Sequence, residues 1–162
     1  MRQAIAISIL GVALVSGEAA AQTATETARI LGDFQRSVVD YTQPQECLGF
    51  IPETLDAASP APKVFTLPVA VVFRQLIANA LARQGGAAMV GGVGAIHHPA
   101  VRQPFPLTES NDFPRVLADA LPALPAPLEF RLIDRDLVIR DANAGVIVAV
   151  LRDAVGTSAT RR

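Results

Sequence analysis

The sequence predicts an α+β fold in which amphipathic helices pack on a small C-terminal antiparallel β-meander. Two observations lead to this prediction. Apolar residues recur at helical spacing in the first half of the chain, whereas three short β-rich segments with turn residues between them occupy the C-terminal third. Such a meander buries one face only if a helix covers it, and the chain has a suitable helix.

The first 21 residues have the character of a secretory signal peptide. Arg2 gives the N-terminus a positive charge, residues 4–17 are uncharged and apolar, and Ala19–Ala21 offer the small residues that signal peptidase requires. The apolar run of about fourteen residues is too short to cross a bilayer of roughly 30 Å. We therefore expect cleavage near Ala21, a periplasmic or secreted protein, and no stable transmembrane segment after cleavage. The alternative is an uncleaved membrane anchor.

An amphipathic helix is predicted over residues 23–41. Thr23 and Glu26 fit a capping box at its start, and Pro44 is expected to end it. The apolar residues on one face of this helix are Ile30, Leu31, Phe34, Val38 and Tyr41.

The predicted domain organisation follows from composition. Residues 22–62 comprise this helix and a connector, since residues 51–64 carry three prolines and several small residues. An α+β domain is expected over residues 63–155, and residues 156–162 are polar and expected to fray. Removal of residues 1–21 from the 162-residue chain leaves 141 residues, enough for one compact domain.

A second helix is predicted to begin after Thr66, a suitable N-cap, with Pro68 in its first turn and Gly85–Gly86 as its stop. Its wide apolar stripe consists of Val69, Val72, Phe73, Leu76, Ile77, Ala80 and Leu81. A stripe this wide indicates a core helix.

Glycine and proline interrupt residues 85–112, and a short extended piece is expected only around residues 100–105. A short helix is predicted over residues 112–120, with Asn111 as its cap and Pro114 in its first turn.

Three strands are predicted at Leu128–Ile133, Asp136–Arg140 and Val146–Leu151. Residues 66–83 are the expected helical cover for one face of the resulting sheet. Period-two spacing assigns to shared faces Phe130 with Leu132, Leu137 with Ile139, and Val146 with Val148 and Val150.

The C-terminal third contains the run Leu121-Pro122-x-Leu124-Pro125. This run is followed by Leu128-Glu129-Phe130-Arg131 and then by Asp136-Leu137-Val138-Ile139-Arg140-Asp141. The combined pattern resembles that of a group of small exported bacterial proteins. More distantly, it is similar to periplasmic nickel and cobalt homeostasis proteins. The closer group has no assigned activity, so the resemblance implies a fold and a compartment but no catalytic residue. Ala149 stands where the group usually has an aspartate.

The adjacent histidines His97 and His98 are the candidate metal ligands, because imidazole binds zinc, nickel and copper. Neighbouring side chains in an extended chain point to opposite sides, so a site would need Glu109 or Asp112 brought close by folding. The alternative is a solvated loop. No cofactor other than such a divalent transition metal is expected.

Composition limits the possible partners. The formal net charge is −1, which argues against nucleic acid and anionic membrane surfaces as partners and leaves a protein or envelope partner. Cys47 is the only cysteine, so no intramolecular disulfide can form. Cys47 is expected to be buried and inert, with an intermolecular disulfide or a reactive thiol as alternatives.

A cluster of charged residues surrounds the predicted strand turns, and we expect a solvated rim with weak ion pairs. Its members are Asp134, Arg135, Asp136, Arg140, Asp141, Arg152 and Asp153. The sequence thus favours an exported, non-enzymatic interaction or envelope-associated module. The alternatives are a periplasmic metal-binding or metal-responsive protein and, third, a small hydrolase.

Overall fold

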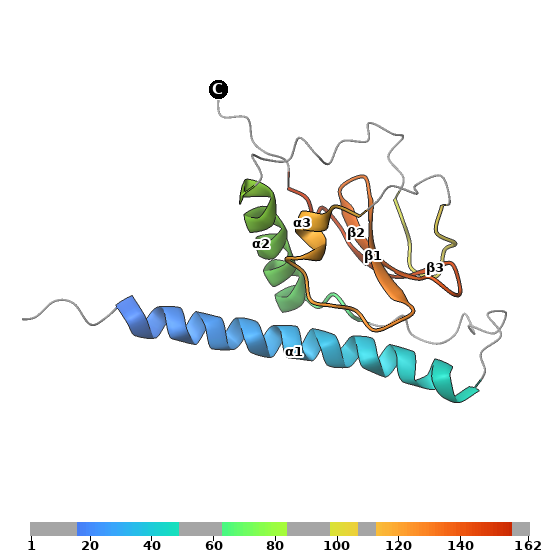
Figure 1. The fold of residues 1–162 in the computed structure, drawn as a ribbon, viewed down its shortest axis with the longest axis horizontal. Helices are drawn as coiled ribbons and strands as arrows, with labels where there is room; N and C mark the ends of the chain where they lie inside the picture. The colour runs from blue at the N-terminus through green and yellow to red at the C-terminus, as the bar shows by residue number, and fades with distance from the viewer. Residues whose placement is uncertain (1–15, 49–62, 84–97, 107–112, 157–162) are drawn as a thin grey trace, which may run out of the picture.

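The structure, a computed structural model, describes residues 16–48, 63–83, 98–106 and 113–156 of the chain. The elements are α1 (Ser16–Leu48), α2 (Leu67–Arg83), α3 (Arg115–Ala118), β1 (Leu128–Ile133), β2 (Asp136–Asp141) and β3 (Val146–Leu151). Figure 1 shows α2 and α3 beside the sheet and the long helix α1 running along one end of this unit. The predicted α+β class with a C-terminal antiparallel meander is confirmed.

The sheet has the strand order β1-β2-β3, and both neighbouring pairs are antiparallel. Strands β1 and β3 have the predicted bounds, whereas β2 continues beyond Arg140 to Asp141. The turn before β3 ends at Gly145, whose φ of 68° is a conformation that glycine adopts without a steric penalty. Residues 134–135 connect β1 to β2 and residues 142–145 connect β2 to β3, and these short connections hold the three strands in register.

A β-bulge in β3 changes which of its side chains face the helices. Ile139 pairs with Ala149 and Arg140 pairs with Ile147, which leaves Val148 as the extra residue. The extra residue inverts the alternation of side chains along the strand. The side chains of β3 in the core shared with α2 are Val148, Ala149 and Leu151. The expectation that the three even-numbered valines of β3 share one face is therefore wrong.

The opposite face of the sheet carries a smaller apolar cluster. Residues 102–105 lie antiparallel to β3, where the N–H of Ile147 donates to the Gln103 carbonyl at 2.9 Å. An antiparallel bridge between Pro104 and Val146 confirms the extended character predicted for this segment. The buried members of the cluster are Phe105, Ile133, Val138 and Ile147, with Val150 packed against them.

Helix α2 lies on the other face of the sheet, as predicted. Every residue of its predicted stripe is buried except Leu76, which is half-buried against the same core. The carbonyl of Thr66 accepts the N–H of Ala70 at 2.8 Å, so Thr66 occupies the expected N-terminal position. The Phe73 ring is fully buried at the centre of the face that meets the sheet.

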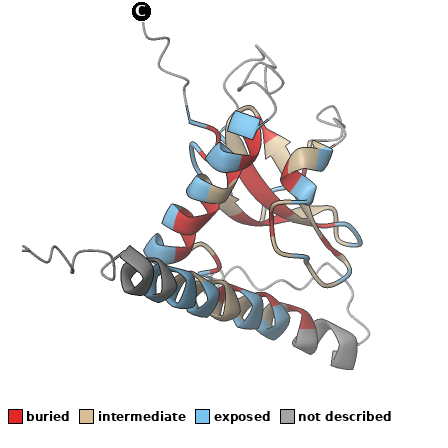
Figure 2. Ribbon diagram, turned by 60° about the vertical axis from the view of Figure 1, so that its left-hand side comes forward, coloured by how far each residue is buried: buried red, intermediate tan, exposed pale blue. Residues whose placement is uncertain are grey.

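Helix α1 contacts this core along one face, and most other residues of its described part, 22–42, are half-buried or exposed (Figure 2). The Phe34 ring of α1 lies 4.7 Å from the Phe73 ring of α2. The residues of the predicted face are Phe34 and Val38, which are buried, and Ile30, Leu31 and Tyr41, which are half-buried. The predicted face of this helix is confirmed.

Both ends of α1 differ from the prediction. The helix begins at Ser16, so Thr23 lies inside it, and the Glu26 carboxylate pairs with an arginine one turn further on rather than with the backbone. The alanine-rich stretch before Thr23 favours a helix, which accounts for the earlier start. The helix also passes Pro44 and ends at Leu48. A proline removes one helical hydrogen bond and can bend a helix without ending it.

Helix α3 is shorter than predicted. The helix expected over residues 112–120 is present only at Arg115–Ala118, and Pro114 occupies the N-cap position without a side-chain cap. Pro114 has a ψ of 124°, which is not helical, so the helix cannot include it. The expected cap, Asn111, lies outside the described residues. Leu117 is fully buried and fixes α3 to the core.

Some predicted features fall outside the described residues, namely residues 1–15 of the signal peptide, residues 51–62 of the connector and residues 157–162 of the tail. Cys47 lies in the last turn of α1, but its side chain is outside the description. In the described part of the chain, no helix has both the length and the apolar character needed to cross a membrane.

The carboxylate of Asp141 is buried at the end of β2, with 1% of the residue exposed. Its Oδ1 atom accepts hydrogen bonds from the N–H groups of Asn143 and Ala144, both at 2.9 Å. Asp141 was expected in a solvated turn. The side chain instead turns inward because it satisfies the backbone donors of the turn.

We predict that Asp141→Ala lowers the free energy of unfolding by about 1–3 kcal/mol, because two backbone N–H groups lose their acceptor. Asp141→Asn keeps an oxygen at this position and should cause a smaller loss. Urea unfolding followed by circular dichroism measures both. Equal losses in the two variants would contradict the proposed role of the Oδ1 acceptor.

Candidate functional site

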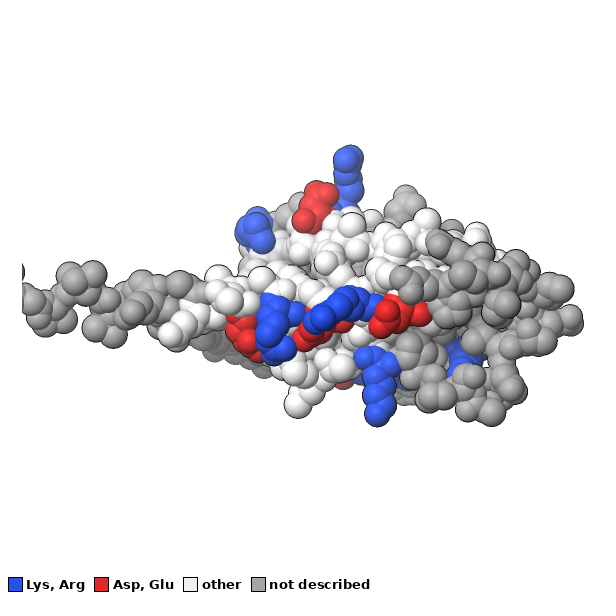
Figure 3. Space-filling view, turned by 90° about the horizontal axis from the view of Figure 1, so that it is seen from below, with Lys and Arg blue, Asp and Glu red and all other residues white. Residues whose placement is uncertain are grey.

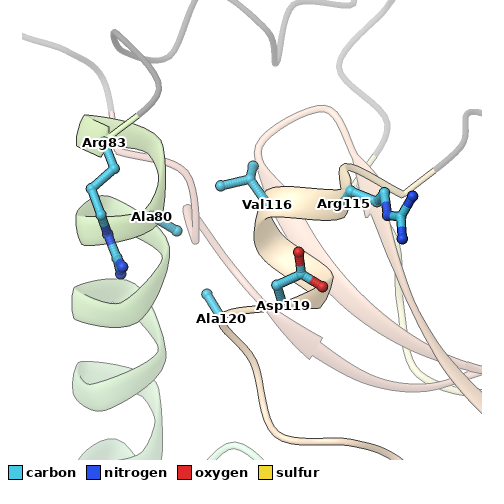
Figure 4. A pocket seen from close by; sticks show the side chains of 6 residues that line it. All are labelled: Ala80, Arg83, Arg115, Val116, Asp119 and Ala120. Carbon is cyan, nitrogen blue, oxygen red and sulfur yellow. The ribbon is translucent and has the colours of Figure 1, made fainter.

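A surface groove lies between the C-terminal end of α2 and helix α3 (Figure 4). It has a volume of about 450 Å³ and is lined by Ala80, Arg83, Arg115, Val116, Asp119 and Ala120. Its floor is apolar and its rim is charged. This α2–α3 groove is the candidate site.

Small side chains on both sides leave this space open. Figure 4 shows Ala80, Val116 and Ala120 directed into the gap between the two helices. Leu117, the neighbour of Val116, is buried in the core, so the turn of α3 presents Val116 toward α2. The N–H of Leu121 donates to the Leu117 carbonyl at 3.0 Å, which holds the chain after α3 in a further turn. The groove is thus built from residues on two elements that share one core.

Three exposed charged side chains surround the apolar floor. The Nε atom of Arg83 donates to the Asn79 carbonyl at 3.2 Å, at the end of α2 where free carbonyl groups attract positive charge. Arg115 and Asp119 both belong to the α3 side of the groove, and Figure 4 shows the Arg115 side chain directed away from α2. No other described residue forms an ion pair with any of these three groups.

The predicted metal ligands are only partly described. His98 is exposed and precedes the buried Pro99, whereas His97, Glu109 and Asp112 lie outside the described residues. The residues that the structure does describe contain no group of three or more His, Cys, Asp or Glu side chains that could hold a metal ion. A metal site at the histidine pair stays a prediction.

The charged residues near the strand turns join separate segments of the fold. The Asp136 carboxylate accepts hydrogen bonds from the Arg152 guanidinium at 2.7 Å and from the N–H of Asp153 at 2.8 Å. Arg152 also donates to the Pro99 carbonyl, and Arg74 of α2 donates to the Arg152 carbonyl at 2.8 Å. Arg152 and Asp153 are exposed, as expected of a solvated rim, and these hydrogen bonds also connect β2, the end of β3, α2 and the Pro99 segment.

The outward face of α1 carries alternating charges (Figure 3). Arg29 pairs with Glu26 at 2.5 Å and with Asp33 at 2.9 Å, and Arg36 also pairs with Asp33. The hydrogen bond from Arg29 lowers the pKa of Glu26 below its ordinary value of 4.5. These pairs are exposed and contribute little to stability. The face is a solvated helix surface on which Glu26, Arg29, Asp33 and Arg36 are already paired with one another.

The chain matches no protein-family model, no curated protein and no solved structure. The resemblance to small exported bacterial proteins therefore stays a prediction.

The residues of the groove carry no local sequence signal. Arg83 and Arg115 lie on opposite sides of the glycine- and proline-rich residues 85–112, and alanine in a helix is unremarkable. Only the packing of α3 beside α2 brings them together. The sequence feature that comes nearest to marking the groove is a charged residue next to small apolar residues at the end of a predicted helix.

The metal hypothesis predicts a calorimetric signal when the mature protein is titrated with nickel, copper or zinc at micromolar concentration. His97→Ala/His98→Ala should abolish this signal, because both imidazole ligands are removed. Ser37→Ala, in which a hydroxyl inside α1 is removed, should leave it unchanged. The absence of heat with the unaltered protein, or unchanged binding by the double variant, would contradict the hypothesis.

Proposed function

We propose that this chain is an exported bacterial protein, periplasmic or secreted, that works as a non-enzymatic interaction module. The α2–α3 groove carries this proposal, since it combines an apolar floor with charges that have no ion-pair partner among the described residues. Protein-recognition sites use the same combination, in which an apolar anchor supplies affinity and polar groups at the rim supply selectivity.

The groove suits a protein segment that presents an apolar side chain next to a carboxylate. Arg83 and Arg115 both line the groove, and once the exposed Arg115 side chain rotates toward α2 each guanidinium can donate paired hydrogen bonds to a carboxylate, while the floor accepts the apolar group. Asp119 adds a negative charge that disfavours a polyanion such as nucleic acid. A chain with a formal net charge of −1 agrees with that exclusion.

The hydrogen bonds made by Asp136, Asp141 and Ser37 favour binding over catalysis as the function of this chain. Asp136 and Asp141 accept hydrogen bonds from backbone N–H groups, so their carboxylates stabilise the fold. The Ser37 hydroxyl donates to the Asp33 carbonyl at 3.1 Å inside α1. A hydrolase would need its nucleophile and base elsewhere in the chain. Metal binding through His97 and His98 is the second candidate function.

Export predicts a processed N-terminus. When the complete chain is expressed in a bacterium, the periplasmic form should begin at Gln22, as N-terminal sequencing can determine. Ala21→Leu places a larger side chain where a small one is required and should make the precursor accumulate. A full-length protein that stays in the cytoplasm would contradict export.

The groove predicts a partner that depends on its two arginines. A photo-crosslinking amino acid in place of Asp119 should capture an envelope protein, and the same group in place of Arg36 on the solvated face of α1 should not. Arg83→Glu/Arg115→Glu should reduce the Asp119-site adduct roughly tenfold or more, since it reverses both rim cations. Arg29→Glu is the matched control on α1.

Thermal unfolding of each variant checks that the fold is retained. An adduct of equal yield with and without the double charge reversal would contradict the groove as the binding site.

A further inference from the structure

The outer edge of β1 presents backbone groups that the sheet itself does not use. The N–H of Ala142 donates to the Pro127 carbonyl at 3.0 Å, which makes these two residues a hydrogen-bonded pair of the β1–β2 ladder. Bonded pairs alternate along an antiparallel ladder, so the residues of β1 bonded to β2 are Glu129, Arg131 and Ile133. The N–H and C=O groups that point away from β2 are those of Leu128, Phe130 and Leu132.

The two edge strands differ in how far their edges are covered. Residues 102–105 bond to the outer edge of β3. In the described part of the chain, the backbone bond to the outer edge of β1 runs from the Leu128 N–H to the Pro125 carbonyl at 2.9 Å. The four inner residues of β1 are half-buried, whereas those of β3 are mostly buried (Figure 2). An open edge of this kind is a template for another strand.

We propose that β1 pairs antiparallel with β1 of a second copy of this chain, with Phe130 opposite Phe130 of the second copy. The two sheets then form one continuous sheet across a two-fold axis. The inner-face row beside the axis is apolar, because Leu128 lies opposite the second copy's Leu132.

Charge complementarity selects this register. Glu129 lies opposite the second copy's Arg131, and the symmetry repeats the pair, so two opposite-charge pairs face each other directly. Within its own chain, Glu129 already contacts Arg131 at 2.8 Å and Arg140 at 3.2 Å. In the joined sheet each Glu129 therefore lies between two arginines on the neighbouring strands. Arg140 of the same chain is on one side, and the second copy's Arg131 is on the other.

The available hydrogen bonds fit the same register. Phe130 exchanges both of its bonds with the second copy's Phe130, and the Leu132 N–H reaches the carbonyl of the second copy's Leu128. The Leu128 N–H is not required, which agrees with its bond to Pro125. A register centred on Arg131 would place Arg131 of one copy opposite Arg131 of the other. Directly opposed like charges destabilise a strand pair.

Sedimentation equilibrium of the mature protein, from micromolar to millimolar concentration, tests the proposal. The protein should form a dimer, and Arg131→Glu and Glu129→Arg should each raise the dissociation constant roughly tenfold or more, because each leaves like charges opposed at both symmetric positions. An equimolar mixture of the two variants restores both opposite-charge pairs and should form a heterodimer. Arg36→Glu on the solvated face of α1 should dimerise like the unaltered protein.

Leu132→Pro provides an independent test if Glu129→Arg does not fold. The Leu132 N–H points away from β2, so proline at this position leaves the β1–β2 ladder intact but removes a donor that the second copy needs. It should abolish the dimer while thermal unfolding stays cooperative.

A monomer at every concentration would overturn the proposal, and so would a dimer that neither Arg131→Glu nor Leu132→Pro weakens. A mixture of charge variants that stays monomeric would overturn the register centred on Phe130. None of these variants changes the α2–α3 groove, so crosslinking at Asp119 reports on the proposed function separately.

Discussion

The packing of the Phe73 ring on three other aromatic rings is the interaction on which the arrangement of this chain depends. Its centroid lies 4.7 Å from that of Phe34 on α1, 5.4 Å from that of Phe65 and 6.0 Å from that of Phe130 on β1. Each such pair contributes about 0.5–1.5 kcal/mol beyond the burial of its apolar area. One side chain thus joins the N-terminal helix, the segment before α2 and the edge strand of the sheet.

The position of both proposed surfaces follows from this cluster. A helix is rigid over a few turns, so the placement of Phe73 also places Ala80 and Arg83 at the far end of α2. Helix α3 reaches the same core through Leu117, and the groove is the space that the small residues between the two helices leave unfilled. Contact of α2 with Phe130 covers the face of β1, whereas within the described residues the outer backbone edge of this strand is bonded only through the Leu128 N–H.

Features with local signals were predicted well from the sequence. The strand bounds follow from period-two spacing between turn residues, and α2 follows from Thr66 and a stripe at helical spacing. Features set by distant partners were not predictable. The bulge at Val148 exists only relative to β2, and Asp141 turns inward only because the turn has donors to satisfy. The groove combines residues from both sides of residues 85–112, so no local pattern marks it.

A double-mutant cycle between Phe34 and Phe73 tests most directly whether the aromatic cluster holds α1 on the domain. Each residue is replaced by leucine, singly and together, and the free energy of unfolding is measured by urea denaturation. We predict a coupling energy of about 0.5–1.5 kcal/mol, since the two rings share a contact that either substitution removes. Additive losses with zero coupling would show that α1 does not depend on Phe73, and would contradict the arrangement described above.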